Sequence, residues 1–276
     1  MGQVPQRCAD VDAAFLNQVL PVECRGGATV AGVEVEVIGE GVGFVGEVAR
    51  VTLRYDGHDT PPPGAIRSLI AKVPTTNPGF KHLGLMLGFY EKEHGFYADV
   101  AGRVPLSVPA AYFNHADHEA GEYMLLLQDM APLRPGNQLA SCSLEEAEVV
   151  LRAIASFHAA WWEHPDLAGF ESWLPGPGSP YFHILEAGYK DSLPAVPQVF
   201  GHLLSDEVMA LAHRMAECYH DAIELGVGRR PHTFIHGDFR LDNMMFGPNL
   251  EFTLLDWQLP CRANPLWDVV YFLAGN

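Results

Sequence analysis

The sequence has no apolar run approaching the ~18–20 residues that a helix needs to cross a bilayer. The longest apolar candidates, such as Met124–Leu127, have the length of a β-strand. The N-terminal segment contains no apolar stretch that would serve as a secretory signal. We therefore expect a soluble protein with no membrane partner.

Cysteine is scarce and scattered along the chain. The cysteines are odd in number and never form a C-x-x-C pair; they are Cys8, Cys24, Cys142, Cys218 and Cys261. This pattern argues against a disulfide framework and against a structural zinc site. A reducing, cytoplasmic location is the simplest expectation.

Basic side chains are also few. The 276 residues include 17 Lys and Arg against 34 Asp and Glu, which gives a formal net charge of −17. Such a charge disfavours non-specific binding to nucleic acid, so we expect no nucleic-acid partner. The apolar fraction of 48% excludes a disordered chain, and the length suits one large domain or two lobes with separate cores.

The first half of the chain has the periodicity of β-strands. Alternating or continuous apolar patterns predict five strands, at about 33–37, 47–55, 68–74, 110–114 and 122–128. A helical pattern covers about 84–101. We therefore predict that residues 1–128 form an N-terminal lobe, an antiparallel sheet that carries one helix, and that the boundary lies near 129–135.

The second half, residues 129–276, has a mostly helical pattern. Ser143 and Glu146 form a capping box at the start of a predicted helix. Residues 171–200 are rich in Gly and Pro and predict an irregular loop with one short helix. Further helices are expected at about 204–224 and from about Pro265.

A glycine cluster precedes the second predicted strand. Gly41, Gly43 and Gly46 fit the pattern G-x-G-x-x-G-x-V. A dinucleotide-binding loop of this kind must open a helix. The segment after Gly46 alternates like a strand, which favours a flap whose backbone amides cover nucleotide phosphates. An ordinary glycine-rich hairpin is the alternative.

Lys72 lies within the apolar strand pattern of residues 68–74. A buried lysine needs a carboxylate partner, because burial of an unpaired ammonium is costly. On the predicted helix Glu93 lies on the apolar face, Glu91 points away and Lys92 lies at the edge. We predict a Lys72–Glu93 pair that holds Lys72 against the α- and β-phosphates of ATP. A solvated lysine and glutamate are the alternative.

The strongest chemical signal is the segment from His236 to Asn243, followed by Asp256. Asp238 and Asn243 have the D-x-x-x-x-N spacing of a phosphotransferase catalytic loop. Asp238 suits the carboxylate that accepts the hydroxyl proton of an acceptor. Asn243 and Asp256 suit the oxygen ligands of Mg²⁺.

Three further residues accompany this loop. His236 is expected to brace the loop rather than act as the base. Arg240 either reaches the γ-phosphate and offsets its developing charge, or is solvated. Asp268, near the start of the last predicted helix, is expected to accept hydrogen bonds from the backbone of the loop.

These motifs resemble those of the aminoglycoside phosphotransferase and choline kinase family. Similarity to its ecdysteroid-kinase-like (CHK-kinase-like) branch lies in Glu93-x-x-Phe96-Tyr97, Phe157–Trp161 and Pro265–Leu273. The resemblance spans roughly residues 33–273. It implies an α+β, two-lobed protein-kinase-like fold, with an N-lobe of antiparallel sheet plus one key helix and a mostly helical C-lobe.

The same resemblance implies a function. ATP would bind between the lobes, and its γ-phosphate would pass to a hydroxyl of a small-molecule acceptor. The segment from Gln128 to Met130 would be the hinge that holds adenine, so both residues are expected at the nucleotide. An amino sugar, a choline-like amine, a steroid and a lipid-like alcohol all remain open as the acceptor.

Departures from the family pattern limit these expectations. The triplet at 236–238 is His-Gly-Asp rather than His-Arg-Asp, and no A-P-E segment follows, so protein substrates are not expected. The chain stops at Asn276, whereas family members continue through further helices. A homodimer that covers the apolar last helix is therefore expected. A kinase-shaped nucleotide-binding regulatory or scaffold protein with little turnover is the alternative function.

Overall fold

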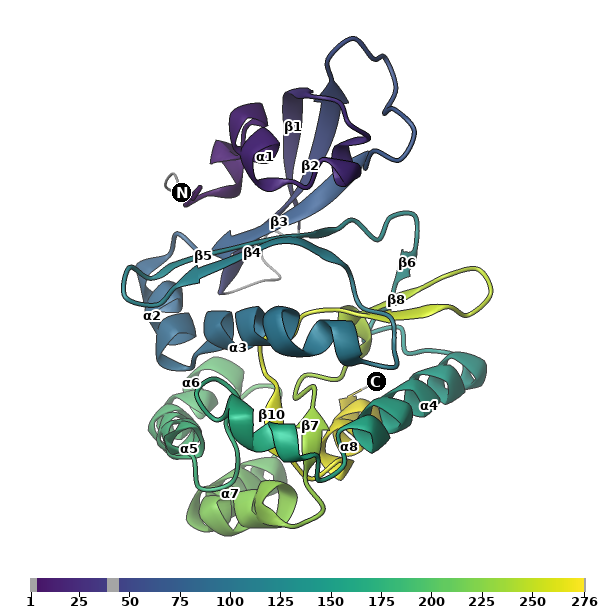
Figure 1. Cartoon of the computed structure of the whole chain (residues 1–276). Coiled ribbons are helices and arrows are strands. Elements are labelled where there is room, and N and C mark those ends of the chain that lie inside the picture. Colours follow the sequence, from purple (N-terminus) through teal and green to yellow (C-terminus); the bar gives the residue numbers. More distant parts are fainter. Residues whose placement is uncertain (1–3, 39–44, 276) are drawn as a thin grey trace.

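An antiparallel sheet lies above a mostly helical part in the computed structural model, which describes residues 4–38 and 45–275 (Figure 1). The sheet has the strand order β1-β2-β3-β5-β4, and all neighbouring strands are antiparallel. Its strands are β1 (Val30–Ile38), β2 (Gly46–Tyr55), β3 (Ser68–Pro74), β4 (Ala111–Asp117) and β5 (Glu122–Gln128). The α+β fold and the predicted sheet are thus confirmed.

Side-chain alternation gives the sheet two different faces. Ala49, Val51 and Leu69 are fully buried on the face that packs against α1 (Ala13–Val19). Lys72 lies three positions after Leu69 in β3, so its side chain projects from the opposite face of the sheet. Its partner in β2 is Val48. The strand periodicity therefore sends the lysine toward the helical part.

The predicted helix at 84–101 is wrong in its continuity. Gly88 has φ +66°, a left-handed conformation that separates two helices and that glycine adopts without steric cost. The first helix begins after the Asn77 cap, whose side chain accepts hydrogen bonds from two backbone amides. The resulting segments are α2 (Pro78–Met86), α3 (Phe89–Gly95), a π turn (Phe96–Val100) and a 3₁₀ turn (Ala101–Arg103).

The helical part has two clusters of buried apolar side chains, a large one under α4 (Leu144–Ala160) and α8 (Leu266–Gly275) and a smaller one between α5 (Pro180–Ser192) and α7 (Asp206–Ile223). Helix α6 (Val196–Phe200) also belongs to this part. Short strands accompany these helices: β6 (Arg134–Pro135), β7 (Thr233–Ile235), β8 (Met244–Phe246), β9 (Phe252–Leu254) and β10 (Cys261–Ala263). The capping box is confirmed, because the Ser143 hydroxyl accepts from the Glu146 amide at 3.1 Å and the Ser143 amide donates back at 2.9 Å.

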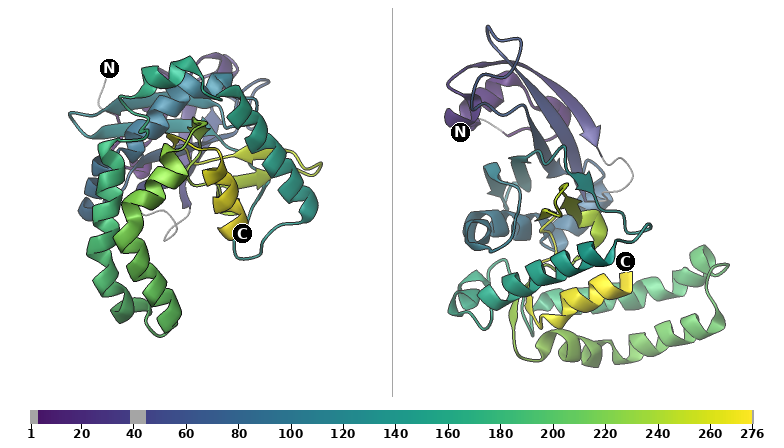
Figure 2. Two further views of the ribbon diagram at one scale, coloured as in Figure 1. Left: turned by 90° about the horizontal axis from the view of Figure 1, so that it is seen from below. Right: turned by 90° about the vertical axis from the view of Figure 1, so that its right-hand side faces the viewer.

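Two helices project from this part as a pair. Figure 2 shows α5 and α7 side by side, extending away from the rest of the chain. The sequence predicted only one short helix within 171–200, but α5 has 13 residues, starting from the Ser179 cap and Pro180. We name this pair the α5–α7 arm.

Part of α8 stays uncovered. Leu266, Val270 and Leu273 are each at least 60% exposed, whereas Phe272 is buried in the core with Val150 and Ile154 of α4. The predicted homodimer remains a prediction, and its physical reason, an apolar helix face open to solvent, is present. The predicted division into lobes at residues 128 and 129 also stays a prediction; β5 ends at Gln128.

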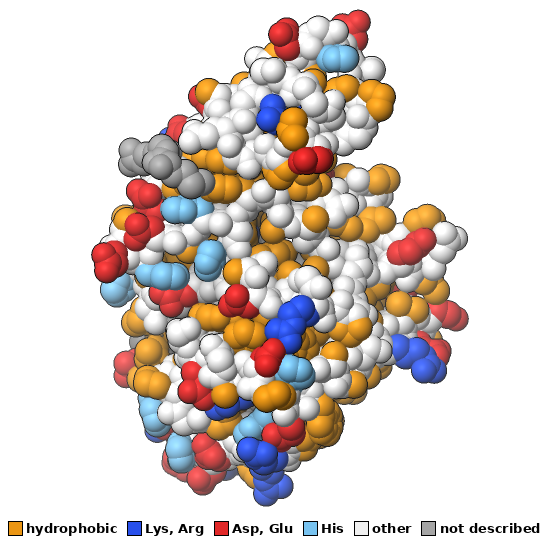
Figure 3. All heavy atoms as spheres, in the orientation of Figure 1, with side chains coloured by type: hydrophobic (Ala, Val, Ile, Leu, Met, Phe, Trp, Pro, Cys, Tyr) orange, Lys and Arg blue, Asp and Glu red, His pale blue; other side chains and the backbone are white. Residues whose placement is uncertain are grey.

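Charged side chains do not gather into a single patch on the face drawn in Figure 3, where acidic and histidine side chains are scattered among uncharged ones. Across the described residues, none of the helices combines the length and apolarity that a bilayer crossing requires.

Candidate active site

Lys72 lies between two carboxylates from distant parts of the chain. Its Nζ is 2.8 Å from each carboxylate oxygen of Glu93 and 2.7 Å from Oδ1 of Asp256. The side chain of Glu93 is 1% exposed, whereas that of Asp256 is 34% exposed. The predicted Lys72–Glu93 pair is confirmed, and Asp256 is the partner that stays open to solvent.

Burial and charge act in opposite directions on these three groups. Burial alone would lower the pKa of Lys72, but Asp256 and Glu93 outweigh it and raise that pKa well above its usual range. Burial raises the pKa of Glu93 even though Lys72 opposes it. Burial also opposes ionisation of Asp256, yet the adjacent Lys72 keeps the pKa of that carboxyl below its usual value. Asp256 is therefore held in its anionic form, and it is the more exposed of the two carboxylates.

Of the three predicted loop glycines, only Gly46 can be placed. It is the first residue of β2, and a methyl group on it would lie 3.7 Å from Cε of Lys72. Gly41 and Gly43 fall outside the described residues. Gly46 thus places the end of the glycine cluster beside the lysine.

Asp238 is held by donors on both oxygens. Oδ2 accepts from Asn243 Nδ2 at 2.8 Å and from Arg240 Nε at 3.1 Å, and Oδ1 accepts from the Tyr271 hydroxyl at 2.9 Å. Arg240 is therefore paired with a carboxylate rather than simply solvated. Burial and the Asp238 charge raise the pKa of Tyr271 to about 12, so this hydroxyl remains a hydrogen-bond donor at neutral pH.

Asp268 accepts hydrogen bonds from the backbone of the loop, as predicted. Its carboxylate accepts from the backbone amides of His236 and Gly237, both at 2.8 Å, and contacts His158 Nε2 at 2.9 Å. His236 in turn contacts the Leu255 carbonyl through Nε2 at 2.9 Å, while its Nδ1 accepts from the Asp238 amide at 3.2 Å. Both ring nitrogens of His236 thus contact backbone groups, one within the loop and one at Leu255.

Asn243 and Asp256 are brought together by a strand pair. Strands β8 and β9 pair Met244 with Leu254, and the Leu255 amide donates to the Asn243 carbonyl at 2.8 Å. Asp256 follows with φ +61°, a conformation that is uncommon for a residue with a side chain and that often occurs at functional sites. The turn directs the carboxylate away from the strand and toward Lys72.

Comparison with known proteins identifies the family. A model of the phosphotransferase enzyme family matches residues 87–276, more than half of the chain. The chain belongs to this family.

Solved structures share its fold. The GDP and kanamycin complex of APH(2″)-IIIa is 15% identical, with 94% of this chain and 77% of that chain covered and a TM-score of 0.57. A spectinomycin phosphotransferase with ADP and spectinomycin is 12% identical, with 95% and 73% covered and a TM-score of 0.52. A macrolide 2′-phosphotransferase type I is 15% identical, with 95% and 77% covered and a TM-score of 0.51.

One curated protein is similar over a short stretch. Acyl-CoA dehydrogenase family member 10 of Mus musculus is 49% identical over 41 residues. That match spans 14% of this chain and 4% of the mouse protein.

The predicted hinge of this phosphotransferase is tied to the sheet. The amide of Gln128 donates to the Ala110 carbonyl at 2.8 Å, and the Met130 carbonyl accepts from the Leu133 amide at 2.9 Å. Between them, Asp129 accepts from Arg50 Nε at 2.8 Å and from the Ser68 hydroxyl at 2.7 Å. The sequence analysis missed this link; the only local signal was a basic residue within the alternating pattern of 47–55.

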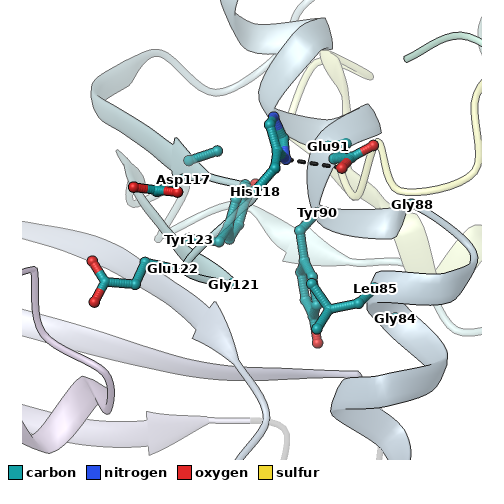
Figure 4. Close-up of a pocket in the computed structure, with 11 residues that line it drawn as sticks. Gly84, Leu85, Gly88, Tyr90, Glu91, Asp117, His118, Gly121, Glu122 and Tyr123 are labelled. Atoms are coloured by element: carbon teal, nitrogen blue, oxygen red, sulfur yellow. Dashed lines mark ion pairs between the residues drawn. The ribbon is translucent and has the colours of Figure 1, made fainter. Parts of the chain in front are cut away.

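A small pocket lies between the α2–α3 link and the β4–β5 turn (Figure 4). His118 Nδ1 lies 2.9 Å from Glu91 Oε1 there, so Glu91 points away from the Lys72 cluster, as predicted.

Within the part of the chain that the structure describes, no three His, Cys, Asp or Glu side chains come together as a metal-binding group.

Lys92 is buried, although the helical pattern placed it at an edge. It is 3% exposed; its Nζ lies 3.4 Å from the centre of the Tyr181 ring and has no hydrogen-bond partner among the described residues. Burial lowers the pKa of Lys92 to about 8. The prediction was wrong because Tyr181 comes from α5, and no local pattern places that ring over α3.

The sequence analysis also missed the contact between Tyr271 and Asp238. Tyr271 lies three residues after Asp268, so both side chains project from one face of α8 toward the loop. That i,i+3 spacing was the available signal.

Proposed function

We propose that this phosphotransferase moves the γ-phosphate of ATP to a hydroxyl of a small-molecule acceptor and depends on Mg²⁺. The observation that carries the proposal is the placement of Lys72 between Glu93 and Asp256, 2.8 and 2.7 Å from their oxygens. Phosphoryl transfer requires a fixed cation at the phosphates and a carboxylate at the metal, and this cluster provides both.

The nucleotide side of the proposal uses the sheet and the hinge. Lys72, fixed by Glu93, would contact the α- and β-phosphates, and the glycines 41, 43 and 46 would cover them with backbone amides. The backbone of the segment that contains Gln128 and Met130 would hold adenine. The Arg50–Asp129 link, at 2.8 Å, supports this part by fixing that segment against the sheet.

Asn243 and Asp256 would hold the metal ion. An amide oxygen and a carboxylate suit Mg²⁺, which prefers oxygen ligands and takes the rest from phosphate and water. The fit rests on two observations: Asp256 is partly exposed, and the Asn243 amide nitrogen is bonded to Asp238, which leaves the amide oxygen for the metal. Mg²⁺ would supply positive charge at the phosphate oxygens.

The acceptor side of the proposal centres on Asp238. Its carboxylate would orient the acceptor hydroxyl and take the proton as the new oxygen–phosphorus bond forms. Arg240, 3.1 Å from that carboxylate, would offset negative charge at the transferred group. His236 would keep the loop in place through its two backbone contacts.

The last part of the proposal concerns the class of acceptor, the branch of the family, the cellular location and the oligomeric state. The names of the structural relatives include kanamycin and spectinomycin, both hydroxylated small molecules. We retain the CHK-kinase-like resemblance, the cytoplasmic location and the homodimer as parts of this proposal.

The test is ATP turnover with a panel of hydroxylated acceptors: kanamycin, spectinomycin, choline and a sterol. Asp238→Asn should lower turnover by about 10²–10⁴-fold and leave Mg-ATP affinity nearly unchanged, because it acts on the acceptor. Asp166→Asn, which breaks an exposed pair with Arg103 outside this loop, is the control and should stay within about threefold. Unchanged turnover in Asp238→Asn would contradict the role of Asp238. ATP binding without any turnover would favour the regulatory alternative.

A further inference from the structure

The two oxygens of Asp238 have different neighbours. Oδ2 receives donors from Asn243 and Arg240, which belong to the same loop. Oδ1 receives the hydroxyl of Tyr271, which belongs to α8, at 2.9 Å. Oδ1 is thus the oxygen whose hydroxyl donor comes from outside the loop.

A phenol hydroxyl at this oxygen has the chemistry of an acceptor hydroxyl. An acceptor must donate a hydrogen bond to Asp238 before it transfers its proton, at a heavy-atom distance of roughly 2.6–3.2 Å. The Tyr271 hydroxyl makes a bond of that kind and length to Oδ1. It therefore holds the place that the proposed mechanism assigns to the substrate.

Tyr271 also lies between Asp238 and solvent. The tyrosine is 39% exposed, whereas Asp238 is 9% exposed. Removal of the phenol hydroxyl would leave Oδ1 with a vacant position of the size of a water molecule, next to an exposed surface.

The helix that carries Tyr271 is fixed relative to the loop. Asp268, one turn earlier on α8, is fully buried and bonds the amides of His236 and Gly237. Phe272, the next residue after Tyr271, packs against Phe239 with ring centres 5.7 Å apart. The hydroxyl is thus delivered to Oδ1 by a rigid support rather than by a mobile side chain alone.

We propose that Tyr271 is a specificity-determining residue that excludes water from the proton-accepting oxygen of Asp238. The acceptor hydroxyl replaces the tyrosine hydroxyl at Oδ1, and water does so poorly. This inference rests on the proposed function. Without Tyr271, a water oxygen attacks the γ-phosphorus, the bond to the β,γ-bridging oxygen breaks, the water proton passes to Asp238, and ADP and inorganic phosphate are formed.

The test is ATP hydrolysis by the full chain with Mg-ATP and water as the only acceptor. Tyr271→Phe keeps the ring and removes the hydroxyl, and it should raise the hydrolysis rate about 5–10-fold with an unchanged KM for ATP. Tyr189→Phe is the matched control: its hydroxyl donates to the Ala212 carbonyl at 3.1 Å in the arm, and the rate should not change. A purely supporting role for Tyr271 predicts the opposite sign, a lower rate.

A double variant tests the route. Tyr271→Phe combined with Asp238→Asn should abolish the increase, because water then has no carboxylate to take its proton. An unchanged or lower rate in Tyr271→Phe, while the wild type phosphorylates a member of the acceptor panel, overturns this inference alone. No hydrolysis and no transfer in either protein overturns both the inference and the proposed function. Melting temperatures of all variants establish that each is folded.

Discussion

The ammonium of Lys72 and the carboxylate of Asp256 lie 2.7 Å apart although 184 positions separate them in the chain. One comes from the middle of β3 and the other from the turn after β9. This ion pair links the sheet to the helical part at the candidate active site, so the position of each charged group is fixed by the other half of the chain.

The role of Glu93 predicts a nucleotide-specific defect. Glu93→Gln removes the buried charge that fixes Lys72, so the KM for ATP should rise about tenfold and kcat should fall. Steady-state kinetics with varied ATP measure both. Glu91→Gln, two residues away and paired with exposed His118, is the control and should leave both parameters unchanged. Equal effects of the two variants would remove Glu93 from the site.

The contacts of Asp268 predict a large loss of stability. Asp268→Asn replaces one accepting oxygen with an NH₂ group that faces a backbone amide, so the free energy of unfolding should fall by about 2–3 kcal/mol. Urea unfolding followed by fluorescence measures this change. Asp166→Asn breaks an exposed pair with Arg103 and should cost less than about 0.5 kcal/mol. The prediction fails if both variants unfold at the same urea concentration.

Lys92 predicts a pH-dependent stability. Its pKa is lowered to about 8 in the folded chain, against 10.5 as the ordinary value. Between these values the unfolded chain holds a proton that the folded chain has released, so the free energy of unfolding contributed by Lys92 rises with pH from about 8 to 10.5. Below pH 8 the buried ammonium costs on the order of 3 kcal/mol.

Lys92→Met removes this effect and keeps the length of the side chain. The variant should exceed the wild type in stability at pH 7, and the difference should shrink as the pH rises toward 10. Denaturant midpoints at several pH values measure it, and subtraction of the two curves cancels the titrating groups that do not interact with Lys92. Lys190→Met, from an exposed pair with Glu186, should give a difference that does not vary with pH. A pH-independent difference for Lys92→Met would contradict the buried-charge assignment.

Gly95, the last residue of α3, packs so closely against Trp173 that a larger side chain should not fit. A methyl group there would collide with the Trp173 ring, so Gly95→Ala should destabilise the chain by about 2 kcal/mol. Gly102→Ala is the control, because nothing lies within 4 Å of a methyl group at that position. Thermal unfolding compares the two. Equal melting temperatures would show that Trp173 moves aside without cost.

Local patterns predicted the parts of the fold that depend on neighbours in sequence. Alternation placed β1 and β2, the capping box placed the start of α4, and the apolar face of the helix identified Glu93 as the partner of Lys72. The D-x-x-x-x-N spacing brought Asp238 and Asn243 together, because both lie on one short loop.

Long-range contacts were beyond these patterns. The burial of Lys92 depends on Tyr181 of α5, and the second partner of Lys72 comes from the far end of β9. The break at Gly88 was missed because glycine is tolerated within helices and only its positive φ ends α2. Sequence patterns thus predicted contacts within one loop or one helix face better than contacts between elements far apart in the chain.

The segment formed by α3 and the π turn after it is attached on two sides, and this attachment bears on nucleotide binding. On one side His94 Nδ1 lies 2.7 Å from Asn114 Oδ1 of the sheet, and on the other Phe96 stacks on Trp257 with ring centres 3.7 Å apart. These contacts hold Glu93 at Lys72, so we expect the carboxylate to need little ordering when a nucleotide binds.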